Sequence, residues 1–398
     1  MTNRLAVTLG SLLYIASARS EVLRVCASGC GHTTIQSAID AAKTNDTILV
    51  SPGLYRENLT VTVNPNAASK DNINLWTSAH ASLPPNGTQV EGNDPHLVRV
   101  RTADGRPALN VGNHENVVVA HGIDIDSDTI KFETSDGLQE QEGIVCFGRE
   151  LPSPLVSGQI YYLRRWSPET RTASLSEVPG GGAINLTSVG SSNDDNYYQR
   201  PRCTRWKQPS NWNVRGFAFE CADRARCHHM VHVGRNEQPV PQQGPNNWHF
   251  SHIVISSLPT NPNGPMFGLS LLAGSGHRVT DFQISGVKCG GLRDGGCESK
   301  GIWLQNVNDV EIRNGLIEAA SINLMTAGGD AARGAVVSNI RILENRFIKP
   351  GYMMFKTGSA IPDGECYYGD GSGAFYYRVG LLPDTCANGA CYSCTPAN

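Results

Sequence analysis

The densest group of residues that could carry chemistry lies between residues 294 and 349 of the 398-residue chain. Lysine and arginine can remove a proton from the carbon beside a carboxylate, and a nearby cation offsets the charge that then develops. This set predicts β-elimination on an acidic polymer. The candidate catalytic residues are Lys300, Arg313, Glu318 and Arg341, and the candidate substrate-binding residues are Asp294, Glu298, Asp330 and Lys349.

Arg313 and Arg341 alternate with isoleucines along two predicted strands. Successive side chains of a strand point to opposite faces, so both arginines should point outward if the isoleucines point inward. An outward basic pair on adjacent coils of the chain could hold an acidic sugar. The alternative is an ordinary solvated surface.

Glu318 lies in the apolar run LIEAASINLMTAGGD, which ends at Asp330. The two carboxylates could bind Ca²⁺ together with a substrate carboxylate, since hard cations take several oxygen ligands. A structural role for Glu318 is the alternative, and no other metal site is predicted. The asparagines at neighbouring turns fit stacked side-chain amides that satisfy turn backbone; they are Asn306, Asn308, Asn314, Asn339 and Asn345.

Histidines gather in CHHMVHVG, residues 227–234. The Met-Val-His-Val run favours a strand, in which His228 and His232 would be about 13 Å apart at ~3.3 Å per residue. That separation is too large for one metal ion.

Aromatic residues crowd the middle of the chain, and Trp166 and Trp206 are the candidates there for stacking on sugar rings. Aromatic faces provide large contact areas for such rings. The alternative is that these residues form the core of a small β domain.

One pattern recurs along the chain, an asparagine followed by alternating apolar residues. Its period of two predicts strands, and units of about thirty residues that cannot bury their own apolar faces predict a solenoid. The copies are ENVVVAHGIDI (115–125), NWNVRGFAFE (211–220), NNWHFSHIVIS (246–256), HRVTDFQISGV (277–287), NDVEIRNGLIE (308–318) and SNIRILENRFI (338–348).

The remaining segments divide the chain around this solenoid. A short amphipathic helix, with Ile35, Ala38, Ile39 and Ala42 at helical spacing, is expected to cap the first strands. Short strands joined by Gly, Pro and Asp turns predict a small all-β insertion. The expected units are a signal peptide (1–20), the cap and first coils (21–125), the insertion (126–192), the main coils (193–350) and a Cys/Gly-rich C-terminal segment (351–398).

The N-terminus and the cysteines predict export. Arg4, an apolar stretch and Ala16-Ser17-Ala18 fit a signal peptide, and twelve cysteines in an exported chain favour local disulfides such as Cys26 with Cys30 and Cys221 with Cys227. A zinc site at the C-terminal cysteines is the alternative use there. The formal charge of −3 gives no basic face for nucleic acid, and no later apolar run is long enough for membrane insertion.

The stretch TIQSAIDAAKTNDTILVSPGLYREN resembles the start of pectin-lyase-like right-handed parallel β-helix proteins. Residues 74–90, 301–330 and 342–350 are similar to parts of a bacterial exported subfamily, and the insertion is similar to a small β module of phage tail proteins. The resemblance implies an all-β right-handed parallel β-helix in an extracellular setting. It does not imply one activity, because the superfamily includes lyases, hydrolases, esterases and tail spikes.

Together these observations predict an exported β-helix protein that binds polysaccharide and cleaves uronate polymers by elimination. Ca²⁺ is the candidate cofactor, and the oligomeric state stays open. A hydrolase is less favoured, because the sequence has no compact aspartate arrangement like that of the polygalacturonases, and Asp194-Asp195 lies in a polar turn after the insertion. The opposing hypothesis is a non-catalytic extracellular protein for adhesion or assembly.

Overall fold

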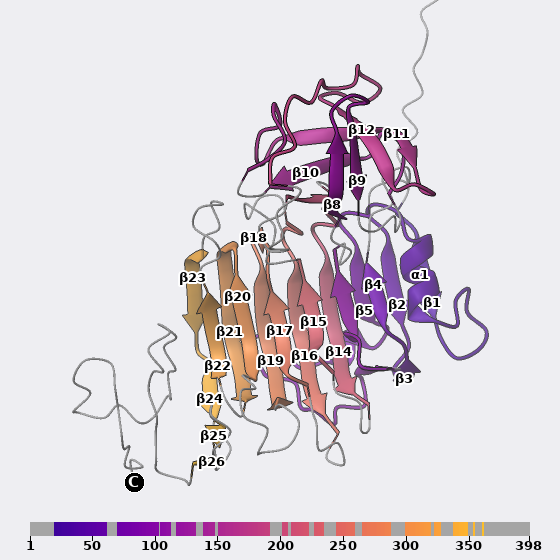
Figure 1. Cartoon of the computed structure of the whole chain (residues 1–398). Coiled ribbons are helices and arrows are strands. Elements are labelled where there is room, and N and C mark those ends of the chain that lie inside the picture. Colours follow the sequence, from indigo (N-terminus) through magenta and orange to yellow (C-terminus); the bar gives the residue numbers. More distant parts are fainter. Residues whose placement is uncertain are drawn as a thin grey trace, which may run out of the picture.

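The structure is a computed structural model of the whole chain (Figure 1). Nearly all of the predicted signal peptide and of the C-terminal segment lies outside the residues that it describes. The described residues are 20–61, 70–102, 104–112, 117–132, 138–147, 150–191, 201–205, 208–222, 227–234, 244–258, 265–287, 299–319, 322–327, 337–348, 353–354 and 360–361.

Parallel strands from successive coils stack into one long sheet, here called sheet A. Several of its strands bend at a corner, so that one coil contributes two straight segments to the sheet. The strands are β1 (Val22–Val25), β2 (Thr47–Val50), β3 (Gly53–Arg56), β5 (Asn74–Thr77), β6 (Val98–Arg101), β14 (Asn213–Cys221), β16 (His249–Ser257), β18 (Gly274–Ser275), β19 (Arg278–Val287), β21 (Val307–Ala319), β23 (Val337–Leu343) and β24 (Arg346–Ile348).

A second parallel sheet, sheet B, closes the coils on the opposite side of the core. The two sheets together form the predicted parallel β-helix, whose coils run from β1 at one end to β23 at the other (Figure 1). In spatial order sheet B contains β22 (Ile322–Ala327), β20 (Lys300–Gln305), β17 (Phe267–Leu271), β15 (His229–Val233), β7 (Leu109–Val111) and β4 (Leu59–Val61).

The core is a set of apolar columns along the helix axis. In each coil, sheet A contains a segment of three residues of which the middle one points inward. Because the strands pair in register, these inward residues lie directly above one another in successive coils. Burial of each such side chain stabilises the fold by about 1.5–3 kcal/mol. One column contains Ile48, Leu75, Val214, Phe250, Val279 and Ile312, all at most 1% exposed.

The corners of sheet A form a second kind of column, here called the corner column. Its residues have φ values of 79°, 51°, 55°, 52° and 57°, in the left-handed region that few side chains adopt. Strand register places them on consecutive coils. They are Gly216, His252, Asp281, Asn314 and Glu344.

Asparagines stack at the turns that begin the coils of sheet A, in what we call the turn column. Asn72 donates to the side-chain oxygen of Asn45 at 3.1 Å, and Asn247 donates to that of Asn211 at 2.7 Å. Asn339 continues the column by donating to a carboxylate oxygen of Asp309 at 3.3 Å.

Among the other predicted turn asparagines, Asn345 satisfies turn backbone directly. It donates to the carbonyl of Ile312 at 2.7 Å and accepts the N–H of Gly315 at 2.9 Å. Asn345 therefore confirms the predicted role of a side-chain amide at a turn, whereas Asn314 and Asn339 donate to the carboxylates of Asp281 and Asp309.

The α-helix among the described residues, α1 (Ile35–Ala41), lies beside the first strands of the solenoid (Figure 1). Thr34 caps its N-terminus by accepting the N–H of Ser37, and Ile35 and Ile39 are fully buried in the main core. The Glu57 carboxylate accepts the N–H groups of Ile35 and Gln36 at 2.9 Å each, which ties the helix start to a neighbouring turn.

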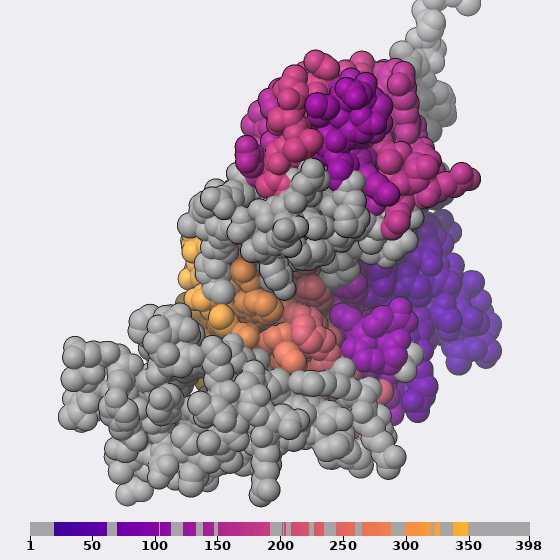
Figure 2. Space-filling view, in the orientation of Figure 1, coloured from indigo at the N-terminus to yellow at the C-terminus, as the bar shows by residue number. Residues whose placement is uncertain are grey.

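The insertion is a closed barrel of six antiparallel strands, above the solenoid in Figure 1 and at the top of the space-filling view in Figure 2. It has its own core, separate from that of the solenoid. Its strands are β8 (Val117–Asp124), β9 (Thr129–Phe132), β10 (Gly143–Phe147), β11 (Ile160–Ser167), β12 (Thr172–Ser176) and β13 (Arg202–Arg205).

The barrel is longer at both ends than the predicted insertion, 126–192. Residues 115–125 were expected to be a solenoid coil, but β8 pairs antiparallel with β9 and β13. Alternating apolar residues fit a strand of either sheet type, so the pattern alone could not assign β8 to the barrel.

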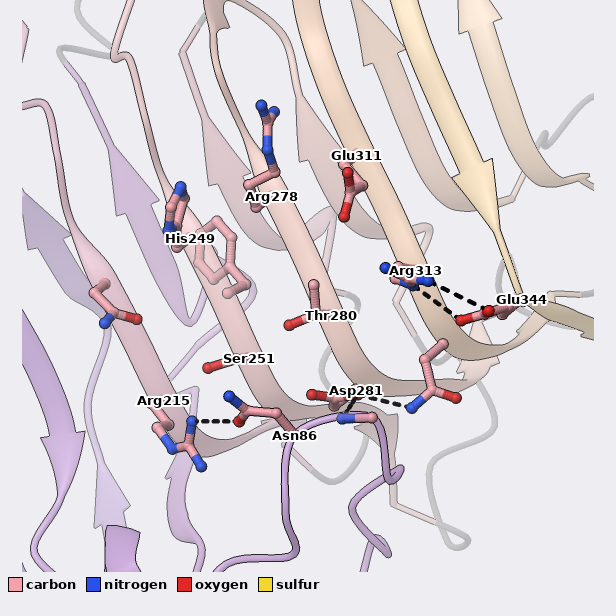
Figure 3. A pocket seen from close by; sticks show the side chains of 14 residues that line it. Asn86, Arg215, His249, Ser251, Arg278, Thr280, Asp281, Glu311, Arg313 and Glu344 are labelled. Atoms are coloured by element: carbon pink, nitrogen blue, oxygen red, sulfur yellow. Dashed lines mark hydrogen bonds and ion pairs between the residues drawn. The ribbon is translucent and has the colours of Figure 1, made fainter.

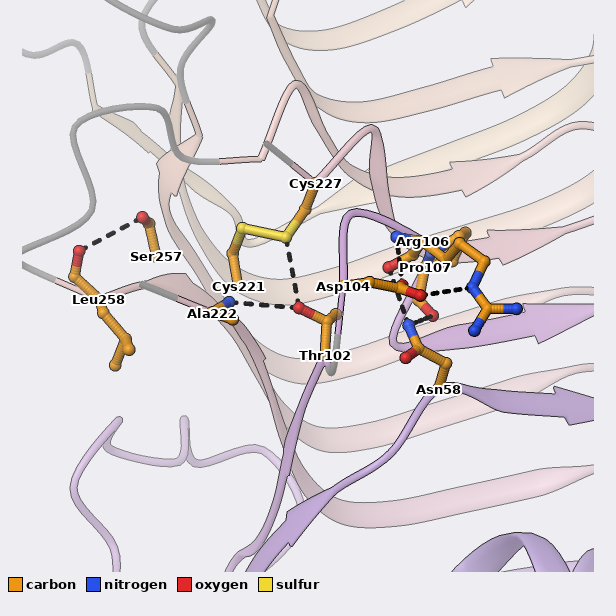
Figure 4. The surroundings of a disulfide bond; sticks show 10 residues. All are labelled: Asn58, Thr102, Asp104, Arg106, Pro107, Cys221, Ala222, Cys227, Ser257 and Leu258. Carbon is orange, nitrogen blue, oxygen red and sulfur yellow. Dashed lines mark hydrogen bonds and ion pairs between the residues drawn. A yellow bond between two sulfur atoms is a disulfide. The ribbon is translucent and has the colours of Figure 1, made fainter. Parts of the chain in front are cut away.

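Three disulfides are present among the described residues. Cys26–Cys30 and Cys221–Cys227 confirm the predicted local pairs, and Cys146–Cys203 joins two barrel strands. Figure 4 shows Cys221–Cys227 between the end of β14 and the start of β15, with Thr102 accepting the Ala222 N–H at 3.2 Å. These disulfides indicate an exported protein. Within the described part of the chain, no helix has the length and apolarity to cross a membrane.

Candidate functional site

A polar groove of about 600 Å³ lies on the outer face of sheet A, between the turn column and the corner column (Figure 3). This volume falls in the range of small-ligand sites. We call it the groove, and its lining consists of Asn86, Gly87, Asn213, Arg215, His249, Phe250, Ser251, Arg278, Thr280, Asp281, Glu311, Arg313, Asn314 and Glu344.

The centre of the groove floor carries two hydroxyl groups. Ser251 and Thr280 are register partners on adjacent coils, and both point outward because Phe250 and Val279, their neighbours in the chain, are buried in the core. Hydroxyls both donate and accept hydrogen bonds, as sugar hydroxyls also do.

Arg215 lies at one end of this floor, as the register partner of Ser251. Its guanidinium donates to the side-chain oxygen of Asn86 at 2.9 Å. Among the residues that the structure describes, no carboxylate lies within ion-pair distance of Arg215. The hydrogen-bond partner of the Arg215 guanidinium is therefore an uncharged amide.

Arg313 lies at the other end of the floor, as the register partner of Thr280. It forms two hydrogen bonds to the Glu344 carboxylate, at 2.9 and 3.3 Å. These bonds raise the pKa of Arg313 and lower the pKa of Glu344, so both stay charged near neutral pH. The pair is exposed, and exposed ion pairs contribute little to stability.

The upper rim of the groove holds a second row of charged residues. Arg278 donates to the Asp309 carboxylate at 2.9 Å and to the carbonyls of His277 and Asp309 at 2.9 and 2.7 Å. Glu311, on the next coil, pairs with Arg341 at 3.1 Å. Each arginine of this rim is thus held by a carboxylate.

His249 lies in the same outward row, as the register partner of Arg278. His249 is exposed on the surface, but the protein around it removes part of its hydration, which lowers its pKa below 6.5, and the positive charge of Arg278 lowers the pKa further. At neutral pH the imidazole is therefore neutral and can accept a proton. Figure 3 shows it above Ser251 at the edge of the floor.

Residues 79–97 form a loop that makes the lower wall of the groove. It is fixed by a small apolar cluster, in which Leu83, Val90 and Leu97 pack against Ala218 and Val254 on the outer face of sheet A. This contact places Asn86 and Gly87 beside the corner column.

Asp281 of the corner column fixes the tip of that loop. One oxygen of its buried carboxylate accepts the Gly87 N–H at 3.0 Å and the Asn314 side-chain N–H at 2.7 Å. The other oxygen lies 4.0 Å from Nδ1 of His252. Burial lowers the pKa of His252, so the neighbours of this carboxylate are neutral near pH 7.

The structure brings two of the four predicted catalytic residues onto one face. Arg313 lines the groove and Arg341 pairs with its rim, as their alternation with isoleucines predicted. Glu318 belongs to the segment of β21 beyond the corner and pairs in register with Ile348. Lys300 begins β20 on sheet B.

Lys300 is buried in an aromatic cluster on sheet B. Its Nζ lies 4.8 Å from the ring centroid of Phe267 and 5.1 Å from that of Trp303. His229 and His232 stack nearby with centroids 4.4 Å apart, on a strand as predicted. Lys300 and the groove are therefore on different sheets.

Of the remaining predicted site residues, the structure describes only Trp166, which is not part of the groove lining. Trp166 is partly buried in the barrel and meets the ring of Phe132 edge-on at 5.8 Å. Five lie outside the described residues, namely Asp294, Glu298, Asp330, Lys349 and Trp206. Among described residues, no group of three or more His, Cys, Asp or Glu side chains could hold a metal ion.

Most groove residues were missed because they are far apart in the sequence. The repeats contain the signal that could have found them. Alignment of NWNVRGFAFE, NNWHFSHIVIS and HRVTDFQISGV at the turn column puts Arg215, Ser251 and Thr280 at one position, two residues after Asn213, His249 and Arg278.

Comparisons with protein-family models and with curated proteins give no match. Among solved structures, the chain is similar to the tailspike gp49 from Pseudomonas phage LKA1, at 14% identity over 78% of this chain and 44% of that one (TM-score 0.32). It is also similar to the gp54 tailspike of Acinetobacter baumannii bacteriophage AP22, solved with a capsular saccharide, at 10% identity over 78% and 44% (TM-score 0.27). A third is the pectin methylesterase from Aspergillus niger, at 12% identity over 83% and 87% (TM-score 0.28).

The chain spans about 44% of the length of these tailspikes. Its own strand topology, with parallel coils stacked around an apolar core, is that of a parallel β-helix, which is the fold that the resemblance implied.

Proposed function

We propose that this chain binds a polysaccharide along the groove. The observation that carries the proposal is the groove itself, in which two hydroxyls on adjacent coils are flanked by arginines at both ends of the row. Coils lie about 4.8 Å apart, so a chain of sugars lying along the helix axis meets a new pair of outward side chains at each step.

We further propose that the bound polymer is acidic and that the groove cleaves it by β-elimination. His249 takes the proton from the ring carbon next to the carboxylate. The C–H electron pair becomes the new C=C bond, and the bond from the neighbouring carbon to the glycosidic oxygen breaks. The departing oxygen takes a proton from the imidazolium, which restores neutral His249 and balances the reaction.

The charges around His249 support this assignment. Its lowered pKa keeps the imidazole neutral, and Arg278 beside it favours negative charge on the substrate carboxylate as the proton leaves. Hydrolysis would need a carboxylic acid as proton donor. Glu344 is poorly suited to that role, because its hydrogen bonds with Arg313 lower its pKa.

The test uses the full chain with pectate, alginate, hyaluronan and a neutral glucan. Cleavage is followed by the ultraviolet absorbance of the unsaturated uronate, and binding is followed separately by calorimetry. We expect His249→Gln to lower the cleavage rate by about a hundredfold or more while binding persists. His32→Gln, outside the groove, is the matched control.

The alternative is a non-catalytic extracellular protein that uses the groove for adhesion or assembly. Binding of an acidic polymer with no new unsaturated ends would favour this alternative and contradict elimination. Absence of binding to every polymer would contradict the groove proposal as a whole.

A further inference from the structure

The charges that line or border the groove are almost all compensated within the protein. Arg313 is paired with Glu344, and both arginines of the upper rim are paired with carboxylates. The lining itself contains three arginines against three carboxylates. The groove is therefore not a continuous positive track for a polyanion.

Among the described lining residues, Arg215 is the arginine that has no carboxylate partner. Its hydrogen bond goes to the neutral amide of Asn86, and it keeps a full positive charge at one end of the floor. A guanidinium with a neutral partner can bind a carboxylate in two parallel hydrogen bonds without first breaking an ion pair.

The next two positions of the same row carry no charge. Ser251 and Thr280 follow Arg215 on successive coils, and Arg313 comes only on the third. With about 4.8 Å per coil, the backbones at Arg215 and Arg313 are separated by about 14 Å. The middle of the groove thus offers hydroxyls and no cation on its floor.

A second carboxylate over this middle region would meet negative charge. The Asp281 carboxylate borders the floor and accepts its hydrogen bonds from the neutral groups of Gly87 and Asn314. On the opposite side, Glu311 and Arg278 border the floor within their ion pairs with Arg341 and Asp309, so the repulsion comes from Asp281. Like charges in a partly enclosed groove repel more strongly than they do in open water.

We propose that the groove selects a heteropolysaccharide whose acidic sugars are separated by uncharged ones. One carboxylate binds Arg215, and uncharged sugar binds over Ser251 and Thr280. Polymers with a carboxylate on every sugar bind less well. This inference rests on the saccharide-binding part of the proposed function and is independent of cleavage.

The experiment measures affinities for oligosaccharides of equal length by calorimetry. One set is from hyaluronan and from bacterial heteropolysaccharides with a single uronate per repeat, a second is from pectate and alginate, and a third is the first set after reduction of its carboxylates to hydroxymethyl groups. We expect the tightest binding in the first set. Equal or tighter binding of the fully charged second set would overturn the proposal.

Arg215→Gln provides the second arm. It should weaken binding of the best acidic ligand by about tenfold or more, and leave binding of its carboxyl-reduced form nearly unchanged. Arg215→Lys should restore part of the loss, and Arg56→Gln, an exposed arginine outside the groove, should have no effect. An equal loss for both ligand forms would contradict a carboxylate at Arg215.

The two proposals fail differently in this experiment. Absence of binding to all three sets would reject the saccharide groove itself. Binding that tightens with the number of carboxylates, or that ignores Arg215, would reject only the selection for isolated acidic sugars.

Discussion

His277 is fully buried in the turn that precedes β19, where its imidazole is part of the backbone hydrogen-bond network. Nδ1 accepts the Trp248 N–H at 3.4 Å, and Nε2 donates to the Ala273 carbonyl at 2.9 Å. The contact with Trp248 requires the neutral ring, because a protonated Nδ1 cannot accept a hydrogen bond, whereas the charged ring can also donate to Ala273. Burial accordingly lowers the pKa of His277 to about 4.

This residue should make the fold sensitive to acid. Because the folded pKa is below the unfolded value of 6.5, the stabilisation is complete above pH 6.5 and is lost as pH falls toward 4. The difference corresponds to about 3 kcal/mol. In denaturant unfolding, the free energy of unfolding should decrease between pH 7 and pH 4 in both proteins. The decrease should be smaller in His277→Gln than in the wild type, by about 3 kcal/mol.

The comparison is between pH dependences, so any uniform loss of stability in the variant cancels. Val178→Thr, at an exposed position that does not titrate, should retain the wild-type pH dependence. Identical pH profiles for His277→Gln and the wild type would show that His277 does not titrate as its buried contacts require.

The sequence predicted the face of the strand to which a side chain points better than it predicted which residues lie near that side chain in space. Alternation with isoleucine predicted that Arg313 and Arg341 point outward, because period two fixes the face of a strand. It could not predict that Lys300, close to Arg313 in the sequence, lies on sheet B. Neighbours in a solenoid are set by the coil and the corner, and the positions of the corners follow from φ values that sequence alternation does not report.

At the scale of elements, the bend of β14 depends on a glycine. Gly216 has φ of 79°, and a Cβ there would lie 2.4 Å from Cγ2 of Thr77 and 2.9 Å from Cδ1 of Leu83. Gly216→Ala should lower the free energy of unfolding by about 1–3 kcal/mol through steric overlap and backbone strain. Chemical denaturation measures the change.

Gly122→Ala is the matched control for this prediction. Gly122 also has a left-handed φ, 87°, but a Cβ there has no neighbour within 4 Å. Gly122→Ala therefore measures the effect of backbone strain alone. It should lower the free energy of unfolding by less than Gly216→Ala does. Equal losses at the two sites would mean that the contacts with Thr77 and Leu83 have no energetic weight.

The solenoid elements were predictable from repetition, and the barrel boundaries were not. The copies from 211 to 348 were identified as strands and form β14, β16, β19, β21, β23 and β24. Val117–Asp124 has the same alternation and belongs to the barrel instead. A local pattern specifies that a strand forms, whereas its partners are chosen by long-range packing.

For the whole molecule, the barrel and the solenoid should fold as separable units, because their buried clusters share no residue. Replacement of residues 117–205 by a short Gly-Ser linker removes both cysteines of Cys146–Cys203 together and leaves no unpaired partner. The shortened chain should keep a β-type circular dichroism spectrum and a cooperative thermal transition. Its saccharide affinity should equal that of the full chain.

Loss of the cooperative transition would show that the solenoid needs the barrel for folding. Retention of the fold with loss of saccharide binding would place the ligand on the barrel, where Trp166 was the sequence candidate. The groove is built entirely from residues outside 117–205, so neither result is expected.

The central claim is that a saccharide occupies the outer face of sheet A between the turn column and the corner column. A crystal structure of the full chain with its best-binding oligosaccharide tests this claim most directly. We predict sugar density over Ser251 and Thr280, with a carboxylate at Arg215. Density on the outer face of sheet B beside Lys300, or on the barrel beside Trp166, with an empty groove, would contradict the claim.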